Sequence, residues 1–149
     1  MSEVREILLK QLEIEHSQSL HEQHQRATLT NMILVVTAAA LGFISQKGLR
    51  SEMLAVTLPL TFLGVFGALA TGKFYERFGY HVKRMKALQG RLDDLVADLN
   101  LAVTLQQVKQ QHREAHRILG RVKVNILWRS LHLGIATTGL ILSTLIVLH

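Results

Sequence analysis

The sequence predicts an all-α membrane protein with three transmembrane helices that continue into a cytosolic helical stalk. Three apolar stretches, 28–46, 53–72 and 130–148, carry almost no charge. Each is long enough to cross ~30 Å of hydrocarbon, which takes roughly 20 residues at helical rise. They lack the alternation of a barrel strand, so we expect helices. Segments 1–27 and 73–129 are rich in charged helix formers and are expected to build the stalk, as an N-terminal amphipathic helix and an antiparallel coiled-coil hairpin.

The distribution of charge predicts how the chain is oriented. Segment 73–129 carries twelve Lys and Arg against five Asp and Glu, whereas segment 1–27 carries three against five. Because Lys and Arg close to the ends of spans stay on the cytoplasmic side, the basic segment and the N-terminus are expected in the cytoplasm. The loop 47–52 and the C-terminus are then external. Charged residues interrupt positions 1–20, so the first span is expected to be a retained anchor in a bacterial inner membrane.

Two sets of apolar residues at 3-4 spacing predict the hairpin of the stalk. The first set is Met85, Leu88, Leu92, Leu95, Leu99 and Ala102, and the second is Leu105, Val108, His112, Ala115, Leu119, Val122 and Ile126. The two sets are out of phase, so the chain is expected to reverse near 99–103. Thr104 and Gln107 match a capping box at the start of the second arm. Each arm is expected to be a helix of ~26 residues, roughly 39 Å long.

Small residues recur every fourth position in the apolar stretches. They are Ala38 and Gly42 in the first stretch, Gly64, Ala68 and Gly72 in the second, and Gly139 and Ser143 in the third. Such ridges let helix backbones approach closely in lipid. Packing within one protomer explains one such face. The faces that are left over predict contacts between copies, so a homo-oligomer is expected.

Hydroxyl and amide side chains recur in two of the stretches. They are Thr30, Asn31 and Thr37 in the first stretch and Ser130, Thr137 and Thr144 in the third. The last three share one helix face, which can line an aqueous pore when copies assemble around an axis. Ser and Thr can also bond to carbonyls of their own helix, and both interpretations stay open. The lack of Asp, Glu, Lys and Arg at mid-membrane argues against a proton pump, an ion-coupled transporter or a voltage sensor.

A set of cations on segment 73–129 is the most suggestive feature outside the apolar stretches. The set is Lys83, Arg84, Lys86, Arg91, Lys109, Arg113, Arg117, Arg121 and Lys123. These side chains can hold the orientation of the protein and touch anionic membrane lipid. They can also pair with Glu13, Glu15 and Glu22 of the N-terminal helix. A third interpretation is that they bind an anionic ligand such as a nucleotide or an oligonucleotide.

The sequence contains no arrangement that predicts catalysis or a cofactor. The lack of cysteine excludes disulfides, thiolate-ligated metals and a cysteine nucleophile. No glycine-rich phosphate loop, Ser/His/Asp arrangement or enclosed carboxylate pair is readable, so an enzyme is not expected. His112 and His116 are spaced like a chelating pair but lack further ligands, so His112 is expected on the coiled-coil seam and no metal is expected. His132, one turn inside Trp128, is expected to be packed or snorkelling, with pH sensing or contact with lipid headgroups as the alternatives.

The layout of the first two spans resembles a known class of proteins. Two closely spaced spans behind an amphipathic cytosolic helix, with a long helical cytosolic portion, resemble small bacterial transmembrane effectors of antiphage systems, such as the two-span SLATT-type domains. The resemblance covers residues 20–80, and the third span at 130–148 departs from the two-span pattern. It implies membrane permeabilisation by an oligomer that responds to a cytosolic signal. It carries no functional residue across to this chain.

We therefore hypothesise a homo-oligomeric inner-membrane protein that forms a gated pore or ion channel, with the stalk receiving the signal. The alternative is a non-conducting scaffold or accessory subunit that recruits a partner protein through its coiled-coil seam. A third hypothesis is a lipid- or nucleic-acid-binding regulator, whose binding would fall steeply with salt.

Overall fold

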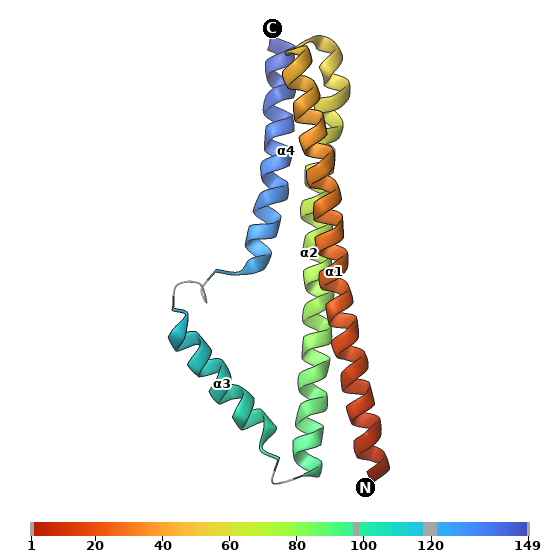
Figure 1. Ribbon diagram of the computed structural model, residues 1–149, viewed down its shortest axis with the longest axis vertical. Helices are drawn as coiled ribbons and strands as arrows, with labels where there is room; N and C mark the ends of the chain where they lie inside the picture. Colours follow the sequence, from red (N-terminus) through yellow and green to blue (C-terminus); the bar gives the residue numbers. More distant parts are fainter. Residues whose placement is uncertain (1, 97–98, 118–121, 149) are drawn as a thin grey trace. The chain divides into compact units, whose positions relative to one another are not determined.

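The computed structural model describes residues 2–96, 99–117 and 122–148, which form four α-helices and one short 3-10 helix (Figure 1). The α-helices are α1 (Ser2–Lys47), α2 (Leu54–Leu95), α3 (Leu101–Ala115) and α4 (Val124–Leu148), and the 3-10 helix η1 (Ser51–Met53) precedes α2. Three of them, α1, α2 and α4, are long and apolar enough to cross a membrane. The prediction of an all-helical chain with three long apolar helices is therefore confirmed.

The chain divides into two compact units, and α1 and α2 each contribute to both. The polar unit comprises Met1–Gln23 and Tyr75–Lys123. The apolar unit comprises His24–Phe74 and Val124–His149. All three uncharged stretches fall in the apolar unit, whereas most of the charged residues fall in the polar unit.

The apolar unit is a three-helix core in which α1, α2 and α4 lie side by side (Figure 1). Ile33 of α1, Leu60 of α2 and Ile135 of α4 form one buried cluster. Ile44, Met53 and Ile146 form a second one. The buried positions of α2 in this unit are 57, 60, 64, 67, 68 and 71. The 3-4 spacing of most of them is the repeat by which helices interdigitate at small crossing angles.

Two glycines let the backbones of α2 and α4 touch. A Cβ added to Gly64 would lie 2.7 Å from the Cα atom of Ala136. A Cβ added to Gly139 would lie 2.7 Å from the backbone nitrogen of Thr61. Because real Cβ atoms do not approach so closely, only glycine fits at either position. The predicted role of small residues in helix packing is thus observed between these two helices.

The connection between α1 and α2 is short and begins at a glycine. Gly48 has a φ of +76°, the left-handed conformation that ends many helices. Its N–H donates to the carbonyl of Ile44 at 2.8 Å, and Arg50 N–H donates back to Gly48 O at 3.1 Å. Residues 48–50 therefore break the helix within the expected loop 47–52.

The start of α3 is capped by a carboxylate from α2. The backbone N–H groups of Leu101 and Ala102 donate to Asp93 Oδ1 and Oδ2 at 2.8 and 2.7 Å. Asn100, with a φ of 46°, is the N-cap residue of α3. The predicted capping box at Thr104 is therefore wrong, because α3 already begins at Leu101 and the Thr104 hydroxyl donates to the Asn100 carbonyl. A carboxylate satisfies the free N–H groups and favours the positive end of the helix dipole.

The predicted second arm of ~26 residues is wrong in its length. Helix α3 ends at Ala115, and its 15 residues, all of them described, include no buried side chain. His112 is exposed, as are Leu105 and Val108, so the expected seam does not pack along α3; Leu119 lies outside the described residues. On the first arm, Leu92 is buried, but Leu95 and Leu99 are exposed. The 3-4 spacing showed that each arm has a face able to pack against another helix. It could not show whether another helix lies beside that face.

We expect Gly64→Ala to destabilise the apolar unit by about 1–3 kcal/mol, because its methyl group must displace the backbone of α4. Gly134→Ala is the matched control. Nothing lies within 4 Å of a Cβ at Gly134 among the described atoms, and alanine is the better helix former. Thermal unfolding of both variants in one detergent measures the difference, and equal midpoints would contradict the close approach.

Candidate functional site

Helices α1 and α2 of the polar unit are held by charges that pair across the interface. Glu22 Oε1 lies 2.9 Å from Arg77 Nε. Glu15 Oε1 lies 3.0 Å from Arg84 Nη2. The two glutamates are seven residues apart in α1, and the two arginines are seven residues apart in α2. The earlier glutamate pairs with the later arginine, so the two ion pairs fix an antiparallel register of the helices. The interpretation that the cations pair with the N-terminal helix is confirmed for Arg84 with Glu15.

The two glutamates are buried, and this makes their partners necessary. Glu15 is 2% exposed and Glu22 is 1% exposed. A second contact joins Glu15 Oε2 to His81 Nδ1 at 2.8 Å. This hydrogen bond from His81, with the charge of Arg84, holds the pKa of Glu15 below its ordinary value although burial acts in the opposite direction. Glu13, two residues before Glu15, is exposed.

The interior of the apolar unit also contains polar contacts. His132 of α4 is fully buried, and its Nε2 lies 3.1 Å from the Thr30 hydroxyl of α1. Since the Thr30 hydroxyl donates its own hydrogen to the Arg26 carbonyl at 2.9 Å, Nε2 is the donor to Thr30. The Nδ1 atom of His132 has no hydrogen-bond partner within the part of the chain that the structure describes. His132 is thus packed, as one of its two predicted roles required.

These contacts correct the pore-lining prediction for α1. Thr30 is 1% exposed and Thr37 is 8% exposed, so both lie in the protomer interior and cannot line a conduit between copies. Asn31 of the same helix is exposed. The sequence pattern placed all three in one group because it could not separate the inward face of α1 from its outward face.

The outward face of α4 carries the remaining lining candidates. Ser130, Thr137 and Thr144 are all exposed. The hydroxyls of Thr137 and Thr144 donate to Leu133 O and Leu140 O at 2.8 and 2.9 Å. These donations satisfy the hydroxyl hydrogens and leave oxygen lone pairs on the outside of the helix. We call this row the α4 polar face.

The small-residue candidates separate into inner and outer positions. Buried between helices are Gly64, Ala68, Gly139 and Ser143. The Ser143 hydroxyl donates to the Thr57 hydroxyl at 2.8 Å across α2 and α4. Gly72 is half-buried, and a Cβ there would contact Arg129 Nε at 3.9 Å. Ala38 and Gly42 are exposed on α1, so this part of the pattern does not pack within the protomer.

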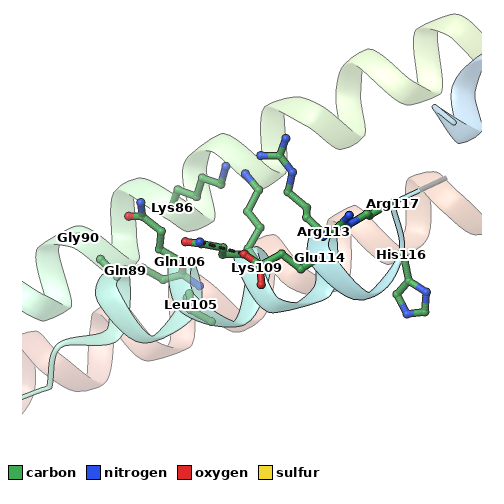
Figure 2. A pocket seen from close by; sticks show the side chains of 12 residues that line it. Lys86, Gln89, Gly90, Leu105, Gln106, Lys109, Arg113, Glu114, His116 and Arg117 are labelled. Atoms are coloured by element: carbon green, nitrogen blue, oxygen red, sulfur yellow. Dashed lines mark hydrogen bonds between the residues drawn. The ribbon is translucent and has the colours of Figure 1, made fainter. Parts of the chain in front are cut away.

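A groove of about 980 Å³ lies between α2 and α3 in the polar unit (Figure 2). Its cations are Lys86, Lys109, Arg113 and Arg117. Its only carboxylate among the described residues is Glu114, which accepts a hydrogen bond from Gln110 at 3.1 Å. Figure 2 shows Lys109 and Arg113 extending from α3 toward α2, on the side where the Lys86 side chain lies. We call this site the basic groove.

The other predicted cations lie elsewhere. Lys83, Arg91 and Lys123 are exposed and do not line the basic groove. Arg121 lies outside the described residues. The rings of His112 and His116 are 4.7 Å apart at the end of α3. In residues 2–96, 99–117 and 122–148, no three His, Asp or Glu side chains gather as metal ligands do.

Sequence reasoning missed Arg77, His81 and the pairing of His132 with Thr30. A signal for Arg77 was present, since Arg77 and Arg84 are seven residues apart, as are Glu15 and Glu22. Matching heptad spacing of opposite charges predicts that two helices pair. No local signal links His132 to Thr30, because 102 residues separate them.

We expect the polar unit to lose stability on acidification through Glu15. Its folded-state pKa is lowered, so its contribution is fully present above the ordinary value of 4.5 and is lost as the pH falls through the folded value. Unfolding midpoints from neutral pH to about pH 3 should show a smaller acid-induced drop in Glu15→Gln than in the unmodified protein. Glu13→Gln, the same change at an exposed position, should follow the unmodified protein, and identical profiles for all three would refute the assignment.

Replacing Thr30 should cost more than replacing Thr37. Thr30→Val removes the acceptor of the buried His132 N–H, which costs about 1–3 kcal/mol. Thr37→Val removes a buried hydroxyl that makes no hydrogen bond to a described residue, so its effect should be near zero or stabilising. Chemical denaturation in mixed micelles compares the two isosteric changes, and a larger cost for Thr37→Val would overturn this reading of the interior.

Comparison with known proteins finds no match among family models, curated proteins or solved structures. The resemblance in layout to two-span effectors therefore stays a prediction, and no residue role is transferred from another protein. Function is argued from the α4 polar face and the basic groove.

Proposed function

We propose that this protein is a multi-pass inner-membrane protein that assembles into a homo-oligomer and forms a gated pore. The observation that carries the proposal is the α4 polar face. Its hydroxyls lie on the exposed side of a helix that is apolar and long enough to cross a bilayer. Assembly around an axis lined by α4 removes these polar groups from lipid and places them along a conduit.

The surface of the apolar unit supports its location in a membrane. Val35, Phe62 and Leu69 are exposed by 70%, 74% and 67%. Soluble monomers rarely expose large contiguous apolar patches, whereas lipid tails accept them without cost. The excess of Lys and Arg in segment 73–129 supports a cytoplasmic polar unit and an external C-terminus.

The chemistry of the α4 polar face suits a passive conduit. Thr137 and Thr144 donate to their own helix, so each oxygen keeps a lone pair that water or a cation can use. The described part of α4 between them contains no Asp, Glu, Lys or Arg. Such a lining offers neither a proton relay nor a gating charge, so the signal for opening has to come from outside the lining.

A second candidate function is recruitment of a partner protein without conduction. The observation that favours it is the exposure of apolar residues on α3. Leu105 and Val108, which share one face of α3, are 43% and 56% exposed. An amphipathic helix with an uncovered apolar face is a common docking element.

Single-cysteine variants can test the pore, because the chain has no cysteine of its own. In liposomes that contain Thr137→Cys, a water-soluble thiol reagent should block most of the ion flux, because its adduct fills the lining. Leu69→Cys, on the exposed apolar side of α2, should keep its flux after the same treatment. Liposomes that stay sealed under every condition would rule out the pore and favour the scaffold.

A further inference from the structure

We infer that the basic groove binds a small ligand that carries two or more phosphate groups at one end of a neutral, hydrogen-bonding body. This inference rests on the proposed function, in which the polar unit receives the signal. It names the chemistry of that signal and the side chains that recognise it.

The two ends of the basic groove differ in chemistry. Close to the connection between α2 and α3, the lining is Gln89 and Gly90 from α2 and Ala102, Leu105 and Gln106 from α3. This end is neutral and offers amides beside an apolar surface. Away from the connection, Lys86 lies opposite Lys109 and Arg113 of α3 (Figure 2). Arg117 lines this end from beyond the end of α3, and Glu114 is its carboxylate. A ligand that fits both ends has one anionic end and one neutral end.

The spacing of the cations selects a chain of phosphates over a single one. Lys109 and Arg113 follow one another at a four-residue interval on α3, and Arg117 lines the basic groove beyond the end of α3 at Ala115. Four residues of helix rise about 6 Å, so Lys109 and Arg113 alone spread their charges over one helical turn. Linked phosphates can contact more of these separated cations at once than a single phosphate can. Arginine adds bidentate donors that match phosphate oxygens.

The basic groove contains four cations and, among the described residues, one carboxylate, Glu114, so most of its positive charge is uncompensated, unlike that of Arg77 and Arg84. Those two arginines each bond to a buried glutamate of α1. No ion pair joins Lys86, Lys109 or Arg113 to any residue in the described ranges. Like charges that face one another repel, and an anion bound between them removes this cost. The volume of about 980 Å³ is at the upper end of the range of small-molecule sites.

Phosphate groups reach such a site either as a soluble ligand or as a lipid headgroup. Both present the same oxygens to the same cations, so the arms of the experiment separate the two sources. The full chain is placed in nanodiscs of zwitterionic lipid, and binding of ATP, tripolyphosphate and orthophosphate is measured by calorimetry. A parallel set of nanodiscs contains an anionic phospholipid whose headgroup carries two or more phosphates, such as a phosphoinositide.

We expect ATP to bind more tightly than tripolyphosphate and orthophosphate to bind weakest. The double variant Lys109→Gln with Arg113→Gln should weaken ATP binding by about tenfold or more. The double variant Lys83→Gln with Arg91→Gln removes the same charge outside the basic groove and should change the affinity by less than about twofold. Unfolding midpoints establish that both variants fold. If anionic nanodiscs displace ATP from the unmodified protein but not from the groove variant, the headgroup is the source; if they leave ATP binding unchanged, it is the soluble ligand.

Three results would overturn the inference: no ATP binding, equal loss of affinity in the two double variants, or orthophosphate binding as tightly as tripolyphosphate. The calorimetry needs no conduction, so it is independent of the flux measurement. Binding of ATP without ion flux would support the ligand site in the basic groove and contradict the pore. Ion flux without binding of ATP would support the pore and contradict the ligand site.

Discussion

The interaction on which the rest of the structure depends is the pairing of polar groups buried between helices with groups on other helices. In the polar unit, Glu15 and Glu22 are buried and meet Arg84 and Arg77 in an antiparallel order. In the apolar unit, His132 donates to Thr30. A buried charge or polar group without a partner is strongly destabilising. Each contact therefore favours one register of the two helices and disfavours the adjacent registers. These contacts contribute specificity, whereas close van der Waals packing at positions such as Gly64 and Gly139 contributes to the stability of the apolar unit.

The same pairing separates structural polar groups from those available for function. Inward side chains such as Thr30 and Ser143 are occupied by contacts inside the protomer. Outward ones keep hydrogen-bonding capacity on the outside of the helices, and two groups of them carry the functional proposals. One is the α4 polar face, with Thr137 at its centre. The other is the basic groove, where Lys109 and Arg113 stand among like charges. The proposed conduit and the proposed receptor for an anionic signal are therefore assigned to different surfaces of the chain.

The sequence predicted the helices more reliably than it predicted their ends. The apolar stretches contain almost no charge, and only helices satisfy every backbone group of such a stretch internally. The end of α3 at Ala115 and the cap from Asp93 were missed. Both depend on atoms outside the local pattern, since the carboxylate that starts α3 belongs to the preceding helix. Among the candidate site residues, hydroxyl periodicity found Thr137 and Thr30 alike, although one is exposed and the other is buried.

By itself, the sequence determined the helical class, the three long apolar helices and the concentration of positive charge in segment 73–129, because periodicity, length and charge are properties of single segments. Only the tertiary structure decided which polar side chains face inward, which glycines touch α4, and that the cations of α2 and α3 border one groove. These outcomes depend on contacts between residues far apart in the chain. A segment's own pattern contains no information about the partner against which it packs.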